Sequence, residues 1–140
     1  DRFVEYTSTN IKKPYEIEHL WANHFERHRN EFESSSDFSE TRNSIGGLIL
    51  VPRGFNQSYG DLVYTEKLPH YLEQNLIARS LHSQAYERNP SFNQFLQDSE
   101  LPFKDYPNLL KADIEERAEL YKLISEKIWD IDIFSNLSRN

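Results

Sequence analysis

An acidic residue followed by a histidine, Glu18-His19, is the first place in the chain where the residue types suit catalysis. A neutral imidazole titrates close to pH 7 and can take a proton from water, and a carboxylate can hold a hard cation such as Mg²⁺. The run from Tyr15 to Leu20 alternates apolar and polar residues, which predicts a half-buried strand. Adjacent strand residues point to opposite faces, so both side chains can serve one site only if the strand ends or twists there. A surface Glu–His pair on an edge strand has the same pattern, and this alternative stays open.

Asn56 adds a third group, because it follows a second predicted strand. The segment 45–52 is apolar, is entered through two glycines and ends at a proline, which cannot donate to a sheet ladder. The segment 53–58 is then expected to turn into a short helix. Hydrolysis of a phosphodiester needs a base that activates water and a cation that neutralises the charge developing on the phosphate. His19 as the base, with Glu18 and Asn56 as ligands of a divalent ion, would provide both.

The distribution of charge limits the kind of nucleic-acid contact that the chain could make. Its 140 residues carry a net charge of −7, which argues against binding through bulk positive charge. The acidity lies outside the segment 41–80, which has four basic and three acidic residues. Arg42 and Arg53 lie in that segment, beside the proposed site, and are candidates for contacts with DNA phosphates, although each could also be a solvated surface charge. Such a domain would depend on a partner domain to bring it to DNA.

The absence of cysteine excludes disulfides and thiolate metal sites. Any metal must be bound by oxygen or imidazole, which favours Mg²⁺, Mn²⁺ or Zn²⁺. His24 and His28 are four residues apart and could share a helix face as zinc ligands, but they lack the glutamate placement of metalloproteases.

The spacing of apolar residues predicts helices around the two strands. A short helix is expected over about 21–32, and an amphipathic helix over 65–81. A further helix is expected from 89 to about 97. The clearest helix spans 113–130, with acidic residues near its start and lysines later, which suits the helix dipole. The expected class is therefore α+β.

Length and composition indicate one domain over residues 1–140, with a core over about 15–81 and a helical C-terminal part over about 82–140. The chain has no methionine, so we expect it to be a piece of a longer protein. No apolar run approaches the roughly 20 residues of a membrane span, and no signal peptide is visible. A cytoplasmic protein without membrane contact is expected.

Three segments of the chain follow the order of a known motif. Glu18-His19 matches the acid–His pair that opens the HNH, or ββα-metal, nuclease motif, and the stretch 42–52 resembles its second strand. Asn56 lies nine residues after Gly47, which is the spacing between the motif's middle Asn and its last ligand. The chain also resembles the C-terminal nuclease domain of GmrSD-like modification-dependent restriction enzymes, and Ssp-type phosphorothioate-sensing defence proteins carry a similar domain. The residues behind this second likeness are 56–61, 64–67 and Tyr71. Lys67 falls at a recurring lysine position of that family, which implies a contact with a DNA phosphate, although it could also be a solvated lysine at the start of a helix.

The resemblance implies an α+β fold with a ββα-metal core, built on a short two-stranded antiparallel hairpin and surrounded by helices. It also implies that His19 deprotonates the attacking water and that Glu18 and Asn56 hold one divalent ion, Mg²⁺ or Mn²⁺. The middle position of the motif is usually Asn, but here it is Gly47. Asn43, four residues earlier, could supply the missing amide to the catalytic site, and the alternative that it only caps a turn stays open.

On this resemblance the chain is expected to be a DNA endonuclease that nicks or cleaves modified or foreign DNA in restriction or antiphage defence. Its expected partners are DNA and an N-terminal regulatory, NTPase-like domain of the same polypeptide. The missing middle Asn favours a second hypothesis, a catalytically inactive relative that serves as a DNA-binding or scaffold module. The helical bulk of residues 65–130 leaves a third, an all-helical interaction domain in which Glu18-His19 and Asn56 have no role.

Overall fold

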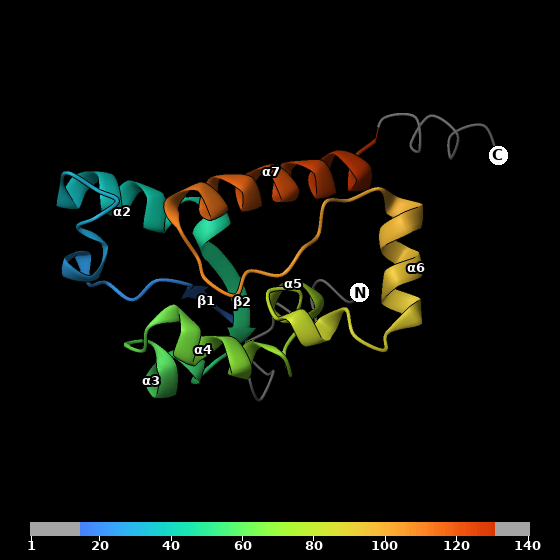
Figure 1. Cartoon of the computed structure of the whole chain (residues 1–140), viewed down its shortest axis with the longest axis horizontal. Coiled ribbons are helices and arrows are strands. Elements are labelled where there is room, and N and C mark those ends of the chain that lie inside the picture. The colour runs from blue at the N-terminus through green and yellow to red at the C-terminus, as the bar shows by residue number, and fades with distance from the viewer. Residues whose placement is uncertain (1–14, 131–140) are drawn as a thin grey trace.

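The computed structural model describes residues 15–130 and shows a mostly helical molecule with a two-stranded antiparallel sheet (Figure 1). This arrangement belongs to the α+β class, as the sequence predicts. The strands are β1 (Tyr15–His19) and β2 (Leu48–Pro52). The α-helices are α2 (Ser35–Asn43), α3 (Phe55–Tyr59), α4 (Tyr64–Tyr71), α5 (Leu76–Arg79), α6 (Pro90–Ser99) and α7 (Lys111–Ile128), and the 3₁₀ helices are η1 (Phe25–His28), η2 (Ile45–Gly47) and η3 (Ser83–Ala85). No helix in the described range is long and apolar enough to cross a membrane.

The two predicted strands pair antiparallel, with His19 opposite Leu48. The pairing continues one step beyond β1, because the Leu20 amide donates to the Gly47 carbonyl at 2.9 Å. The segment 20–47 joins the strands and carries α2. The antiparallel pair is therefore confirmed, but its connection is much longer than the tight turn of a short hairpin.

The helix predicted over 21–32, within the connection between the strands, does not form. Only the 3₁₀ helix η1 forms within that range, and α2 follows it. The start of α2 is set by Ser34, whose hydroxyl accepts the Asp37 amide at 3.1 Å. Trp21 is buried and stacks on Phe38 of α2, with ring centroids 5.9 Å apart. The aromatic residues that suggested a helix here are instead core residues that anchor an irregular segment.

The helix predicted over 65–81 is divided into α4 and α5. Asn75 lies at the division and caps α5, because its Oδ1 accepts the Ala78 amide at 3.2 Å. Its Nδ2 donates to Leu50 O in β2 at 2.6 Å. A contact with the sheet, which the apolar spacing does not reveal, therefore decides where the helix breaks.

Both outer edges of the sheet are closed by side chains from the surrounding helices. In an antiparallel pair, the carbonyls of alternate residues point away from the partner strand and need another donor. Four such carbonyls, two on each strand, accept a hydrogen bond from α3, α4, the N-cap of α5 and α7. The bonds run from Asn56 Nδ2 to Ile17 O (3.1 Å), from Lys67 Nζ to His19 O (2.9 Å), from Asn75 Nδ2 to Leu50 O (2.6 Å) and from the Tyr121 hydroxyl to Leu48 O (2.7 Å).

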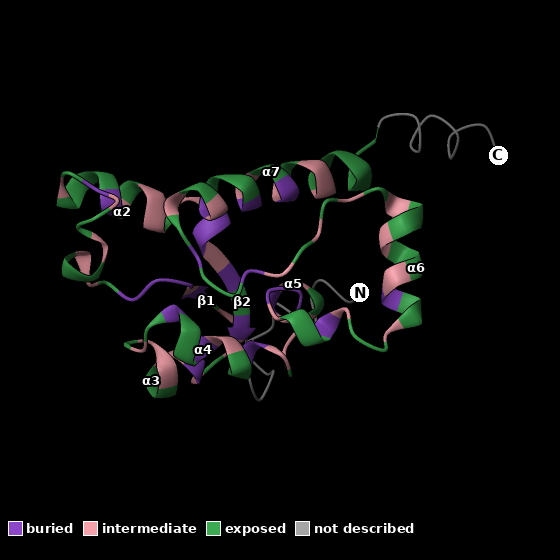
Figure 2. Cartoon of the chain, viewed as in Figure 1, coloured by how far each residue is buried: buried purple, intermediate pink, exposed green. Residues whose placement is uncertain are grey.

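The core lies between the sheet and these helices, and Figure 2 shows buried residues along β2 and exposed residues along the outer side of α7. Ile49 and Val51 of β2 are both buried there. Helix α7 crosses η2 so closely that a Cβ on Gly46 would collide with the Ile114 carbonyl. Arg117, which is buried, donates from Nε to Gly46 O at 2.8 Å. Gly46 in η2, just before β2, is therefore where α7 packs most closely on the rest of the chain.

Replacing Tyr121 by Phe should destabilise the fold, because Leu48 O would lose its donor without a change in shape. We expect the free energy of unfolding to fall by about 1–2 kcal/mol, measured by urea denaturation. Tyr15→Phe is the matched control, since Tyr15 is 50% exposed and should have almost no effect. Equal stability of the Tyr121→Phe and wild-type chains would mean that edge closure does not contribute to stability.

Candidate functional site

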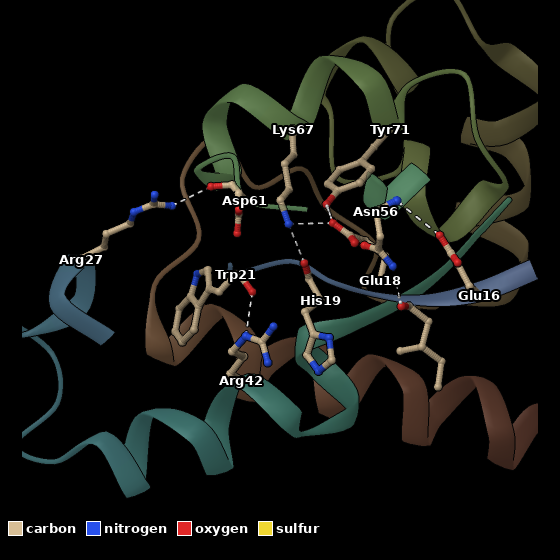
Figure 3. Close-up of polar contacts among 11 residues, drawn as sticks. Glu16, Glu18, His19, Trp21, Arg27, Arg42, Asn56, Asp61, Lys67 and Tyr71 are labelled. Carbon is tan, nitrogen blue, oxygen red and sulfur yellow. Dashed lines mark hydrogen bonds and ion pairs between the residues drawn. The ribbon is translucent and has the colours of Figure 1, made fainter. Parts of the chain in front are cut away.

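The carboxylate of Glu18 lies in a buried ion pair with Lys67. Both side chains are 1% exposed, and Lys67 Nζ lies 2.7 Å from Glu18 Oε1. The Tyr71 hydroxyl donates to the same oxygen at 3.0 Å. Burial raises the pKa of Tyr71 and lowers the pKa of Lys67, and the hydrogen bond with Glu18 opposes the fall for Lys67. The charge of Glu18 is therefore compensated inside the protein (Figure 3).

Simple periodicity explains why these residues meet. Glu16 and Glu18 are two apart on β1 and share one face of the strand. Lys67 and Tyr71 are four apart on α4 and share one face of that helix. Helix α4 lies over the Glu18 side of β1, so one turn of helix supplies both partners of the carboxylate.

The imidazole of His19 is held by Asn43, the last residue of α2. His19 Nε2 and Asn43 Oδ1 are 2.9 Å apart. Arg42 Nη1 can only donate and lies 3.5 Å from the same oxygen, and Asn43 Nδ2 donates to Ser39 Oγ at 3.3 Å. These neighbours assign Oδ1 as the atom that faces His19, so Nε2 carries a proton. In the neutral ring, the lone pair is then on Nδ1.

The surroundings of His19 favour the neutral imidazole. Burial lowers the pKa of His19 below 6.5, and the charge of Arg42 lowers it further. The hydrogen bond with Asn43 and the charge of Glu18 oppose this fall. A base must be unprotonated to accept a proton from water, and this environment keeps the ring unprotonated at neutral pH.

Gly47 occupies the position where the HNH motif usually has Asn, and the backbone leaves no room for a side chain there. A Cβ on Gly47 would lie 2.6 Å from Arg42 O. Asn43 reaches the imidazole of His19 from α2 instead. This contact is more than the turn cap that the sequence left open, while a catalytic role for Asn43 stays a prediction.

Asn56 is held against β1 at the start of α3. Glu16 Oε1 accepts the amides of Gly54 (3.1 Å) and Asn56 (3.3 Å), and Gly54 has the left-handed φ of 96° that a glycine adopts without strain. The side-chain Nδ2 of Asn56 donates to Ile17 O at 3.1 Å. Sequence reasoning missed Glu16, although its place two residues before Glu18 on the same strand face was an available signal.

The predicted site residues fall into two groups on opposite sides of β1. Figure 3 shows the Glu18 carboxylate, Lys67 and Asn56 on the side of α3 and α4, and the His19 ring on the side of α2. His19 is the last residue of β1, so the two groups are joined through one short piece of backbone. The structure does not bring the His19 ring and the Asn56 amide into direct contact with each other.

The three residues predicted to contact DNA have different surroundings. Lys67 is buried and bonded to Glu18, so it is not offered to a phosphate on the surface. Arg42 is half-buried beside His19, and its Nε donates to Trp21 O at 2.9 Å. Arg53 is exposed in the turn between β2 and α3. Arg42 and Arg53 therefore remain available for the predicted role.

The oxygen donors predicted to bind a divalent ion do not form a metal centre in this arrangement. Mg²⁺ keeps several water ligands, but Glu18 is 1% exposed and has an ammonium 2.7 Å from Oε1. No group of three or more His, Asp or Glu side chains within the described part of the chain is placed to hold a metal ion. A cation at Glu18 would have to displace Lys67, so the roles of Glu18 and Asn56 as metal ligands stay predictions.

The position of Arg42 predicts the pH behaviour of His19. Arg42→Gln should raise the pKa of His19, because the nearby positive charge is lost, and Asn43→Ala should lower it, because a hydrogen bond that favours the protonated ring is lost. NMR titration of the ring measures both, with His19→Gln to assign the resonance. Shifts in the opposite directions would contradict the described contacts.

The same lowered pKa has a consequence for stability. As pH falls below 6.5, the unfolded chain takes up the proton before the folded one does. The free energy of unfolding should therefore decrease from about pH 6.5 downward, and decrease less in His19→Gln.

Asn56→Asp separates a structural role of Asn56 from a role as metal ligand. Asp cannot donate to Ile17 O, so we expect the free energy of unfolding to fall by about 0.5–1.5 kcal/mol. Asn75→Asp is the matched control, because it loses the same kind of bond to Leu50 O but is no candidate ligand. Added Mn²⁺ should raise the Tm of Asn56→Asp more than that of Asn75→Asp only if residue 56 binds metal.

Comparison with known proteins adds an independent observation to this geometry. No curated protein and no solved structure matches the chain. The family model described as "GmrSD restriction endonucleases, C-terminal domain" matches residues 2–136, which is nearly the whole chain. The resemblance to GmrSD-like restriction enzymes, carried by residues 56–61, 64–67 and Tyr71, is thus confirmed at the level of the family. The chain belongs to the family of C-terminal domains of GmrSD restriction endonucleases.

Proposed function

We propose that this chain is an HNH-type DNA endonuclease domain in which His19 is the general base for hydrolysis of a phosphodiester. The family is one of restriction endonucleases, which implies a role in cutting DNA. The observation that carries the residue assignment is the hydrogen bond between His19 Nε2 and Asn43 Oδ1, at 2.9 Å. It fixes the ring and leaves Nδ1 as the atom that can accept a proton.

The proposed reaction uses water as the nucleophile. The water oxygen attacks phosphorus and its proton passes to His19 Nδ1. The bond from phosphorus to the 3′ oxygen breaks, and the leaving oxygen takes a proton from solvent. The products then carry a 5′-phosphate and a 3′-hydroxyl. Asn43 keeps the ring oriented and stabilises its protonated form through the Nε2 hydrogen bond.

Arg42 is a predicted DNA contact whose charge acts on this base, because it lowers the pKa of His19. Its guanidinium is fixed by the bond to Trp21 O and lies 3.5 Å from Asn43 Oδ1. A guanidinium in this position can neutralise phosphate charge beside the attacking water. Arg53, exposed before α3, is proposed to contact the backbone of the same DNA strand or its partner.

A divalent ion, Mg²⁺ or Mn²⁺, stays part of the prediction from the resemblance. When bound, it would neutralise charge that develops on the phosphate and the leaving oxygen. The proposed substrate is modified or foreign DNA, in restriction or antiphage defence, delivered with an N-terminal regulatory domain. The proposed compartment is the cytoplasm.

A catalytically inactive DNA-binding or scaffold module is the second candidate. The observation that favours it is the ion pair between Glu18 and Lys67, which occupies the carboxylate expected to bind metal. This candidate predicts binding of DNA without cleavage, whichever divalent ion is added.

Plasmid cleavage tests the proposal. Unmodified and base-modified plasmids are incubated with the chain and Mg²⁺ or Mn²⁺, and nicked and linear forms are quantified. His19→Ala should lower the rate by about 10²- to 10⁴-fold. His70→Ala, which removes an exposed imidazole stacked on Tyr59, should not change it. Asn43→Asp, which keeps the acceptor, should retain more activity than Asn43→Leu. Equal rates for wild type and His19→Ala would sink the assignment.

A further inference from the structure

Lys67 holds both residues of the Glu18-His19 pair at once. Its ammonium lies 2.7 Å from Glu18 Oε1 and 2.9 Å from the main-chain oxygen of His19. The first contact is to a side chain on one side of β1, and the second is to the backbone from which the imidazole extends. The side chain is 1% exposed, so both contacts are made in the interior.

The helix that carries Lys67 is itself anchored near both ends. The hydroxyl of Tyr64, at the start of α4, donates to Tyr106 O at 2.6 Å. The hydroxyl of Tyr71, at its end, donates to Glu18 Oε1 at 3.0 Å. Both tyrosines are buried. Lys67 therefore projects from a helix that cannot easily shift along β1, which makes its ammonium a fixed point.

The outward carbonyl of His19, at the end of β1, needs a hydrogen-bond donor from outside the sheet. His19 is the last strand residue, and its carbonyl faces the open edge of the sheet. Asn43 fixes the ring of His19, but the ring is attached to the same peptide backbone that Lys67 holds. Without Lys67, the next residue, Leu20, would keep its bond to Gly47 O, but the outward carbonyl of His19 would lose its donor.

We propose that Lys67 is a positioning residue for the proposed hydrolysis, which acts by fixing the backbone of His19 rather than by contacting DNA. The proposal rests on the assignment of His19 as the base. It differs from the expectation that Lys67 binds a phosphate, because a side chain that is 1% exposed and bonded to a carboxylate cannot also reach a surface-bound phosphate.

Steady-state kinetics of Lys67→Met on plasmid DNA distinguish the two roles. Positioning predicts that kcat falls by about tenfold to a hundredfold, since a displacement of about 1 Å has an effect of that size. KM and its salt dependence should stay within about twofold of wild type. A phosphate contact predicts a raised KM and a salt slope reduced by about one, and that result would overturn the proposal.

Two control variants isolate the contact to the His19 carbonyl. Lys104→Met changes the net charge equally and removes a half-exposed ion pair with Glu116 and a cation–π contact with Tyr106, both away from His19, so kcat and KM should not change. Tyr71→Phe removes a bond to Glu18 and leaves the bond from Lys67 to His19 O in place. It should lower stability, and kcat should fall less than in Lys67→Met, because the bond from Lys67 to His19 O remains. An equal loss of kcat in Tyr71→Phe and Lys67→Met would show a general packing effect and contradict the proposal.

A second measurement does not depend on catalysis. The His19 ring proton on Nε2 is expected to give a protected NMR signal, because it is hydrogen bonded to Asn43. Lys67→Met should broaden or shift this signal, and Lys67→Arg should restore it in part by keeping a cationic donor. If Lys67→Met does not fold, the comparison is made with Lys67→Arg and Lys67→Gln, which keep donor groups of different reach. An unchanged signal in a folded variant would refute positioning, whereas absence of cleavage by the wild type would refute the proposed function alone.

Discussion

A sheet of only two strands has two open edges, and the need to satisfy their outward carbonyls determines how the rest of the chain is arranged. A hydrogen bond within a protein contributes about 0.5–1.5 kcal/mol to stability, and each of these four outward carbonyls accepts one. The donors come from α3, α4, the N-cap of α5 and α7, which ties these four helical elements to a sheet too small to be stable alone. Two of the donors, Asn56 and Lys67, are residues that the sequence singles out for chemistry. Asn56 and Lys67 therefore both complete the hydrogen bonding of the sheet and belong to the candidate site.

The buried ion pair of Glu18 and Lys67 affects both the stability of the fold and the geometry of the candidate site. Desolvation offsets most of the attraction within a buried ion pair, but loss of one partner leaves an uncompensated charge and is strongly destabilising. The pair is therefore weak evidence for extra stability and good evidence for a fixed geometry, which Tyr71 reinforces from the same helix face. The end of β1 is therefore held by the Glu18–Lys67 ion pair, and loss of either partner would strongly destabilise the fold.

Local patterns in the sequence predicted the elements but not the contacts between them. Alternation over 15–20, the glycine pair and the proline of 45–52 indicated both strands, although the second begins only at Leu48 because 45–47 form η2. The break between α4 and α5 depends on a bond from Asn75 to β2, and the partner of Glu18 lies 49 residues away on α4. Spacing within one segment carries no information about such long-range pairs. The sequence could therefore name Glu18, His19 and Asn56 but not divide them between two sides of one strand.

Residue 47 is Gly where the HNH motif usually has Asn, yet a side-chain amide still contacts His19. The start of β2 passes so close to the end of α2 that no side chain fits at Gly47, and the Arg42 carbonyl occupies that space. The same close approach brings the neighbour of Arg42, Asn43, to the imidazole of His19. The same packing contact thus leaves no space for an Asn side chain at residue 47 and places the side-chain amide of Asn43 beside His19. By its sequence, the motif is incomplete because residue 47 is not Asn. In the structure, however, Asn43 Oδ1 accepts the proton of His19 Nε2. An acceptor within hydrogen-bond distance is all that fixing the tautomer of a base requires.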